Sequence, residues 1–180
     1  SSGARANKMF ATLASSTTGG SGSTIGFSSV VTTSSAPSVP LNAIELHDNS
    51  PYVTDFWNNQ PPNGTSFVVK AGTTLTHAFY LNTELSGFKV YVEGTWDTDY
   101  LAIGKNNKIY VMPGGVFKVN QLAQNAQAAF ENYGSAEIQT MELLNPATYK
   151  NGGVINIKNA TIASGGSFYN YGSAFIENLS

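Results

Sequence analysis

The residues with the clearest potential for chemistry are three carboxylates around a tryptophan, Glu93, Trp96, Asp97 and Asp99. A glycosidase needs two carboxyl groups roughly 5 to 9.5 Å apart beside a sugar-binding surface. A lyase that acts on uronates would also need arginine or clustered lysine to neutralise the substrate carboxylate, and the single arginine of the chain is Arg5. In the competing interpretation these residues form a turn, with the aspartates as turn formers and the tryptophan covering adjacent surface. We favour the turn.

Metal and cofactor chemistry has less support. His47 and His77 have no HxH or HExxH spacing, and a metal site would need Asp48 or another carboxylate to converge on them. The absence of cysteine excludes thiolate ligands and disulfides. Residues 19–22 are rich in glycine but lack the lysine of a phosphate loop. We therefore expect neither a metal site nor a cofactor.

A repeat of 19 residues must position all of these side chains. Three segments, 130–138, 149–157 and 168–176, begin with an aromatic residue and carry asparagine two positions and glycine four positions later. The same period extends one unit backwards, to Val111, Pro113, Gly115, Phe117 and Val119. A fixed period of this length is typical of a solenoid, in which each repeat buries its apolar face against its neighbours.

Strand-like triplets place the units along the chain. The triplets 90–92 and 109–111 are 19 residues apart, and 67–69 precedes the first of them by 23, which predicts a loop of four extra residues. Counting on from 109 gives units near 128, 147 and 166. We predict an all-β fold, a parallel β-helix (β-solenoid) with about 19-residue coils over residues 67–180. Its roughly six turns make a rod on the order of 30 Å long.

The first 66 residues differ from the repeats. Residues 1–40 are rich in serine, threonine and glycine, and we expect a flexible tether or a donor-strand segment with two candidate strands, Lys8–Leu13 and Ile25–Thr33. Residues 41–66 are dense in aromatic and apolar side chains. A solenoid exposes an apolar cross-section at its end, so we predict that residues 41–66 form an N-terminal cap.

Alternation within each unit assigns the faces. The aligned residues Val119, Ile138, Ile157 and Ile176 are predicted to point inward. Charged residues fall on the outer positions, where a parallel stack would place oppositely charged residues above one another: Lys118 and Glu137, Glu131 and Lys150, Lys158 and Glu177. Exposed ion pairs of this kind add only about 0 to 1 kcal/mol.

The recurring Asn-x-Gly is the most specific element of the repeat. We predict a structural ladder in which the asparagine amides stack and the glycines supply positive φ at a corner, formed by Asn132, Asn151, Asn170, Gly134, Gly153 and Gly172. The alternative makes these residues ligands for Ca²⁺ or sugar. We favour the ladder because the calcium-binding nonapeptide repeat needs regular aspartate, which is missing here.

Composition excludes several classes of partner. Only 11% of the 180 residues are charged, the net charge is -2 and the pI is near 5.6. These values disfavour binding to phosphate backbones, so we expect no nucleic acid partner. No apolar run approaches the roughly 18 residues that cross a bilayer, so we expect no membrane-spanning segment.

Four aromatic side chains are candidates for ligand binding. Tyr133 lies in one unit, and Tyr169, Tyr171 and Phe175 lie in the unit two coils further on. They are predicted to form an exposed aromatic strip suited to sugar rings or to another protein.

The phrases Asn-Gly-Gly-Val-Ile-Asn-Ile and Tyr-Asn-Tyr-Gly-Ser-Ala-Phe-Ile, between Tyr149 and Ser180, resemble β-solenoid regions of bacterial surface proteins. The resemblance covers about residues 67–180. It is greatest to autotransporter and filamentous adhesins and to large exported proteins of gut Bacteroidetes with an LruC-type domain. It implies an exported, surface-displayed rod used for adhesion or as a spacer, and no catalytic motif transfers.

The function expected from these observations is that of a non-enzymatic, extracellular or cell-surface stalk or adhesin. The expected partners are a glycan or a surface protein. The chain as given stops at Ser180 without a polar capping segment, so we expect either that the native protein continues or that the open C-terminal coil is covered by self-association. The alternative is a carbohydrate-active β-helix enzyme or phage tail-type depolymerase that uses Glu93, Asp97 or Asp99.

Overall fold

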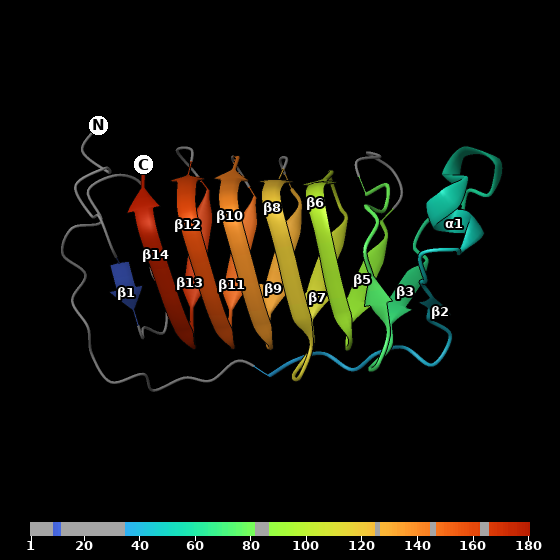
Figure 1. Cartoon of the computed structure of the whole chain (residues 1–180), viewed down its shortest axis with the longest axis horizontal. Coiled ribbons are helices and arrows are strands. Elements are labelled where there is room, and N and C mark those ends of the chain that lie inside the picture. Colours follow the sequence, from blue (N-terminus) through green and yellow to red (C-terminus); the bar gives the residue numbers. More distant parts are fainter. Residues whose placement is uncertain (1–8, 12–34, 82–86, 125–126, 145–146, 163–165) are drawn as a thin grey trace.

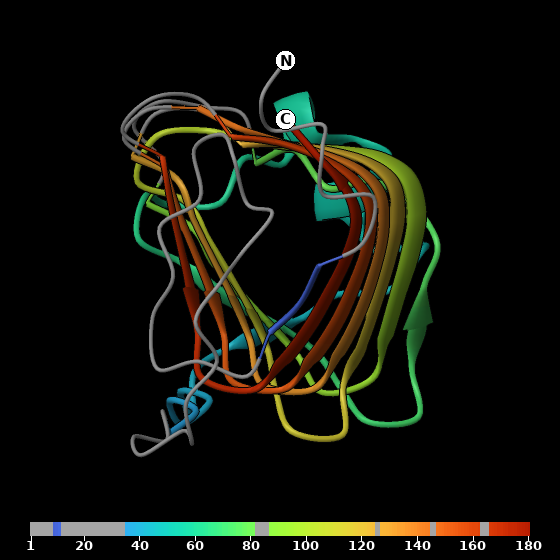
Figure 2. The same cartoon turned by 90° about the vertical axis from the view of Figure 1, so that its left-hand side faces the viewer.

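The computed structural model describes residues 9–11, 35–81, 87–124, 127–144, 147–162 and 166–180. In these residues the chain winds into a β-solenoid of about six turns, which confirms the fold predicted from the 19-residue repeat. Figure 1 shows the strands side by side along the rod, and Figure 2 looks along the rod at the stacked coils.

Two sheets of seven strands form the walls of the solenoid. Sheet A, at the front of Figure 1, has the spatial order β1 (Met9–Ala11), β14 (Ser173–Leu179), β12 (Val154–Ile162), β10 (Ser135–Leu143), β8 (Val116–Gln124), β6 (Thr95–Ile103) and β4 (Thr74–Leu75). Sheet B has the order β13 (Ser167–Asn170), β11 (Thr148–Asn151), β9 (Ala129–Asn132), β7 (Lys108–Val111), β5 (Lys89–Val92), β3 (Ser66–Val69) and β2 (Ile44–Glu45). Neighbouring strands are parallel except for β1, which runs antiparallel to β14.

Equivalent side chains lie above one another in the C-terminal half of the rod. Tyr149 pairs with Phe130 on one side and with Phe168 on the other. The three rings stack inside the core with centroid separations of 4.5 and 5.3 Å. The four residues predicted to point inward from sheet A are buried as expected: Val119, Ile138, Ile157 and Ile176.

The predicted phase is wrong at one corner. Val111 pairs with Asn132, not with Phe130, because Pro113 and Gly114 lengthen the corner between β7 and β8 by two residues relative to the later coils. Gly114 occupies the left-handed region with a φ of 82°, which suits the wider turn. The 19-residue phase returns in β8, which pairs with β10 as predicted. The later units therefore start at 130, 149 and 168, two residues beyond the predicted positions.

One interior column changes its chemistry halfway along the rod. Going from β3 to β13 in sheet B, the last residue of each strand lies above the last residue of its neighbour. The column consists of three valines followed by three asparagines: Val69, Val92, Val111, Asn132, Asn151 and Asn170. The N-terminal coils are thus joined here by apolar packing and the C-terminal coils by amides.

The outer faces carry the predicted charge alignment without close ion pairs. The register places Lys118 beside Glu137 and Glu131 beside Lys150, and a third pair, Lys158 and Glu177, follows the aligned isoleucines of β12 and β14. Within the described residues, ion pairs of 4.0 Å or less occur only in the first turns of the rod. The register therefore brings lysines and glutamates of neighbouring strands side by side, but these residues do not form close ion pairs.

The segment predicted as a cap contains α1 (Pro51–Thr54), the 3₁₀ turn η2 (Phe56–Asn58) and β2. Proline suits the first position of α1 because its missing N–H has no intrahelical partner there. Phe56 closes the core, with its ring 6.0 Å from that of Phe79 and 6.3 Å from that of Phe88. The stack begins inside this segment, since β2 already pairs with β3. No helix among the described residues is long and apolar enough to cross a membrane.

The opposite end of sheet A is covered by the chain itself. β1 lies within the stretch predicted as a strand, Lys8–Leu13, and pairs along β14 from Met9 with Ile176 to Ala11 with Ala174. The edge of β14 is therefore not the free edge from which self-association was predicted. The other residues of the predicted tether before 35, including the second candidate strand Ile25–Thr33, lie outside the described part of the chain.

Candidate functional site

The three repeated asparagines form a hydrogen-bonded ladder inside the rod. The Nδ2 atom of Asn132 donates to Oδ1 of Asn151 over 2.8 Å, and Nδ2 of Asn151 donates to Oδ1 of Asn170 over 2.9 Å. All three side chains are buried. The amides also hold the next corner, because Asn132 donates to the carbonyl of Val154 and Asn151 to that of Ser173, both over 2.9 Å. This geometry matches a structural ladder, not a set of ligands open to Ca²⁺ or sugar.

The glycines of the repeat have a different role from the predicted one. Positive φ is found at Gly64, Gly72, Gly87 and Gly114 among the described residues, not at Gly134, Gly153 or Gly172. The repeated glycines are required by close approach of backbone instead. A Cβ atom at Gly153 would lie 2.2 Å from the carbonyl oxygen of Gly134, and one at Gly172 equally close to that of Gly153.

The acidic stretch is part of a strand, so the predicted turn is wrong. Trp96, Asp97 and Asp99 belong to β6. Trp96 points inward, where it is fully buried, and its Nε1 donates to the carbonyl of His77 over 3.0 Å. Its ring packs edge-on against Phe117 in the next coil. Trp96 is therefore a core residue and offers no surface to a sugar.

The three carboxylates have separate surroundings. Asp97 and Asp99 are exposed on the outer face of sheet A, where Asp99 accepts a 2.7 Å hydrogen bond from Asn120. Glu93 lies at the corner between β5 and β6 and lines a groove together with Glu45 and Lys70. The lining of that groove includes neither Asp97 nor Asp99.

One histidine does meet the predicted carboxylate. His77 Nδ1 lies 3.0 Å from Oδ1 of Asp48, whose two oxygens also accept 2.6 Å hydrogen bonds from the backbone and hydroxyl of Thr76. Burial on its own would raise the pKa of Asp48, but the hydrogen bonds from Thr76 and His77 outweigh it and lower the pKa to about 2. His47 lies 3.6 Å from Glu45 instead. No group of three metal-ligating side chains occurs in the described segments.

The four residues of the predicted aromatic strip do not share one surface. Tyr133 is buried, and its hydroxyl donates to Glu131. Tyr169 lies on the outer face of sheet B, and Tyr171 lies at the following corner, with Lys150 Nζ 5.6 Å from its ring centre. Phe175 belongs to β14 in sheet A, opposite Phe10 of β1. The structure thus separates Phe175 from the tyrosines, and a single strip is not formed.

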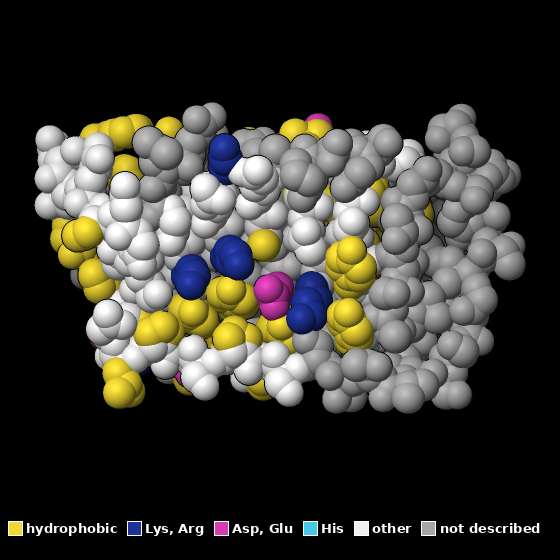
Figure 3. Space-filling model, turned by 180° about the vertical axis from the view of Figure 1, so that it is seen from behind, with side chains coloured by type: hydrophobic (Ala, Val, Ile, Leu, Met, Phe, Trp, Pro, Cys, Tyr) yellow, Lys and Arg dark blue, Asp and Glu magenta, His cyan; other side chains and the backbone are white. Residues whose placement is uncertain are grey.

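Tyr133 instead joins an outer apolar cluster on sheet B. Its members are Val68, Tyr91, Tyr110, Met112 and Tyr133, and three residues of the segment before β2 pack against them: Ala36, Val39 and Ala43. The rear view in Figure 3 shows hydrophobic side chains gathered on this side of the rod, beside lysines and an acidic side chain. The rings of Tyr91 and Tyr110 stack 5.0 Å apart, and burial raises the pKa of Tyr110 to about 12. The cluster fastens the segment before β2 to the solenoid.

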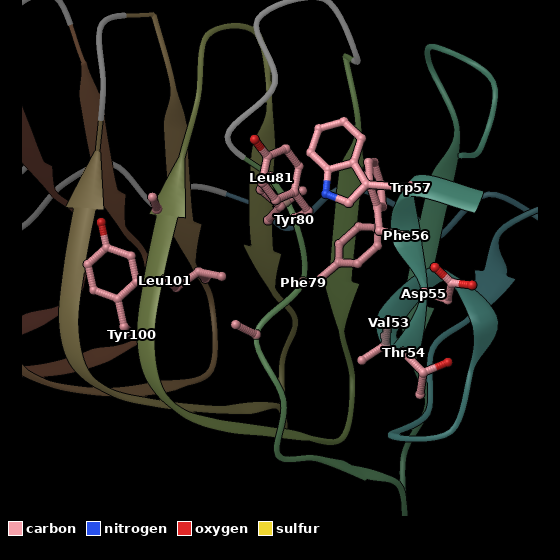
Figure 4. Close-up of a pocket in the computed structure, with 12 residues that line it drawn as sticks. Val53, Thr54, Asp55, Phe56, Trp57, Phe79, Tyr80, Leu81, Tyr100 and Leu101 are labelled. Atoms are coloured by element: carbon pink, nitrogen blue, oxygen red, sulfur yellow. The ribbon is translucent and has the colours of Figure 1, made fainter. Parts of the chain in front are cut away.

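An aromatic hollow that sequence reasoning missed lies between the cap and the first coils. This cap hollow has a volume of about 440 Å³, and the lining residues used below are Asp55, Phe56, Trp57, Phe79, Tyr80 and Tyr100. Figure 4 shows the rings of Trp57 and Tyr80 next to each other, with Tyr100 on the neighbouring strand and Asp55 on the far side. The density of aromatic residues at 52–57 is a sequence signal for this site. The prediction of an N-terminal cap already explains that density, so the sequence gives no separate reason to expect a hollow.

Comparison of the sequence with protein families and curated proteins, and of the structure with solved structures, finds no match. The resemblance to bacterial surface adhesins therefore stays a prediction.

Proposed function

We propose that this chain is the β-solenoid of a non-enzymatic, exported bacterial surface protein, in which it serves as a stalk or an adhesin. The observation that carries the proposal is the continuous packing of the interior along the rod. From Phe67 to Leu179 the buried residues form one continuous cluster, with the asparagine ladder beside it. A stack in which every turn packs against the next suits a stalk that holds an attached domain or ligand away from the cell surface.

The positions of the acidic residues support a non-enzymatic role. A glycosidase needs two carboxyl groups that face one substrate. Here Asp99 is engaged by Asn120 on the outer face of sheet A, and Glu93 lines its groove beside a lysine. Trp96, the expected sugar platform, is a core residue.

Location outside the cell is supported by the resemblance of the repeat to adhesin solenoids, and the composition is compatible with it. The chain has few charges and no cysteine, and its hydrophilic surface depends largely on amides and hydroxyls. Neither feature marks a nucleic-acid-binding protein. The adhesive role would require a ligand that is a glycan or a surface protein.

The adhesive role can be tested by fusing the chain to a bacterial surface anchor. Cells that display it should attach to surfaces coated with a glycan or protein identified on an array, and cells with the anchor alone should not. Gly153→Ala is a matched control, because its Cβ would meet backbone 2.2 Å away and disrupt the stack. Attachment that is unchanged by this variant would contradict a role for the folded solenoid.

The non-enzymatic part of the proposal needs its own assay. The purified chain is incubated with a panel of polysaccharides, and new reducing ends are measured. We expect no turnover. Turnover by the wild type that is lost in Glu93→Gln or Asp97→Asn would overturn the proposal in favour of a carbohydrate-active enzyme.

A further inference from the structure

We propose that the cap hollow is a binding site for a neutral saccharide. The inference rests on the adhesive form of the proposed function and names its ligand class and its site. Three of the aromatic side chains around the hollow are exposed, Trp57 by 63%, Tyr100 by 47% and Tyr80 by 38%. Single exposed aromatic residues are ordinary on a protein surface, whereas three around one hollow indicate a binding site.

The exposed indole is held in place before any ligand arrives. The ring of Trp57 lies 4.9 Å from that of Tyr80 and 5.5 Å from that of Phe56, both in edge-to-face geometry. Phe56 is itself buried and packs against Phe79 in the core. A rigid aromatic surface loses little conformational entropy on binding, which favours recognition of small ligands.

The mixture of apolar and polar groups suits a sugar ring. A pyranose has faces of C–H groups and a rim of hydroxyl groups, so it needs aromatic faces with hydrogen-bonding groups at their edges. Trp57, Tyr80 and Tyr100 supply rings that carry an N–H or O–H group. Asp55 adds a carboxylate on the cap side of the hollow (Figure 4). Its two oxygens accept 3.0 Å hydrogen bonds from Nδ2 of Asn58 and retain lone pairs for a further donor. The volume of about 440 Å³ lies in the range of small-molecule sites, roughly 300 to 1,000 Å³.

Charge selects a neutral sugar over an acidic one. Among the described residues that line the cap hollow, Asp55 is the one with a charged side chain. A uronate or another anionic sugar would bring a second negative charge to this carboxylate, and no lysine or arginine among the described lining residues would compensate for it. Like charges in contact are unfavourable. Neutral hexose or N-acetylhexosamine oligomers avoid this repulsion.

The two tryptophans provide a direct readout on the wild-type chain. Trp57 is exposed and Trp96 is fully buried, so acrylamide should quench mainly Trp57. The probes are neutral hexose and N-acetylhexosamine oligosaccharides, with an oligogalacturonate as the acidic counterpart. A neutral probe is expected to protect Trp57 from acrylamide and to bind measurably by calorimetry. Trp57→Phe should remove the accessible quenching component and so identify the signal.

Variants then test the site. Trp57→Ala and Tyr100→Ala are expected to weaken binding of the neutral probe by about tenfold or more, as for aromatic anchors at other binding sites. Tyr169→Ala is the matched control, an aromatic side chain on the outer face of sheet B, and should leave binding unchanged. Circular dichroism of each variant checks the fold. Asp55→Asn should reduce the preference for the neutral probe over the oligogalacturonate.

Three results would overturn the site: no neutral probe bound at millimolar concentration, equal or stronger binding of the oligogalacturonate, or binding that survives Trp57→Ala. The last of these would leave an adhesive function intact at another place on the rod. Binding to proteins but to no saccharide on an array would likewise reject the site while supporting an adhesin. Cleavage of a glycan would instead reject the proposed function itself.

Discussion

Asn151 and Asn170 are joined by a 2.9 Å hydrogen bond from Nδ2 of the first to Oδ1 of the second, across consecutive turns of the rod. Neither side chain is exposed by more than 1%. Asn151 also accepts from Asn132 below it, so its amide is engaged on both sides. A buried amide with its partners in place stabilises a stack, and the same amide without them would be costly.

Asn151→Ala should therefore lower the free energy of unfolding by about 2 to 4 kcal/mol, because it removes one hydrogen bond from each neighbouring asparagine and the bond to the carbonyl of Ser173 in a dry interior. Asn159→Ala is the control. Its side chain is exposed and accepts one hydrogen bond from Asn178, so its loss should cost less than about 1 kcal/mol. Urea denaturation measures both, and equal effects would contradict the importance of burial.

Gly153→Ala should be more damaging than Gly114→Ala, although only Gly114 has a positive φ. At Gly153 the new Cβ would meet the carbonyl oxygen of Gly134 at 2.2 Å, and backbone cannot move aside easily. We expect a loss of about 3 kcal/mol or more. Gly114 has nothing within 4 Å of its Cβ position, so alanine there costs only the left-handed conformation, about 1 to 2 kcal/mol. Thermal melts would reveal the reverse order if φ were decisive.

Tyr149→Phe should leave stability unchanged or raise it by about 1 kcal/mol at neutral pH, since the buried hydroxyl of Tyr149 has no hydrogen-bond partner among the described residues. Burial raises the pKa of Tyr149 well above its usual value of 10.0. The unfolded chain therefore ionises first, and the wild type loses stability as the pH rises above about 10. The stability advantage of Tyr149→Phe over the wild type should therefore grow as the pH rises above about 10, which urea denaturation at several pH values can measure.

Asp48 should contribute to stability in acid. Its pKa is lowered from 3.8 to about 2 in the folded chain, so its stabilising contribution is complete above pH 3.8 and is lost as the pH falls through about 2. Solvent screening limits this contribution to the order of 1 kcal/mol. Asp48→Asn should be less stable than the wild type at neutral pH, and the difference should shrink between pH 4 and 2. A constant difference between the two melting curves would disprove the assignment.

The 19-residue period predicted the architecture because residues of the same type recur at equivalent positions of successive strands. Phe130, Tyr149 and Phe168 recur at a fixed distance, and in a parallel stack a fixed distance means direct superposition. The phase failed where Pro113 and Gly114 widen a corner, since a local insertion changes the count without changing the stack. A sequence period carries no information on local backbone geometry, so the positive φ predicted for the repeated glycines was also wrong. These glycines are required because the backbone of the neighbouring turn leaves no room for a Cβ atom.

The site was harder to predict than the fold. Trp96 was assigned to a turn because the aspartates beside it resemble turn formers, whereas on β6 they are simply the outward half of an alternating strand. Tyr133 was expected on the surface, but three residues of the segment before β2 pack on its cluster from far away in sequence. The contact of Trp57 with Tyr80 likewise depends on how the cap folds onto the first coils, which no local pattern encodes.

The change from Val111 to Asn132 in the interior column makes the two halves of the rod mechanically unequal. When the rod is stretched along its axis, coils joined there by dispersion contacts should part at lower force than coils tied by buried amides. Extension would then begin among the first coils and stall at Asn132, a sequence of events that single-molecule pulling can record as a step of reproducible length. A tethered protein built this way would yield from one end under load while its other half stayed folded.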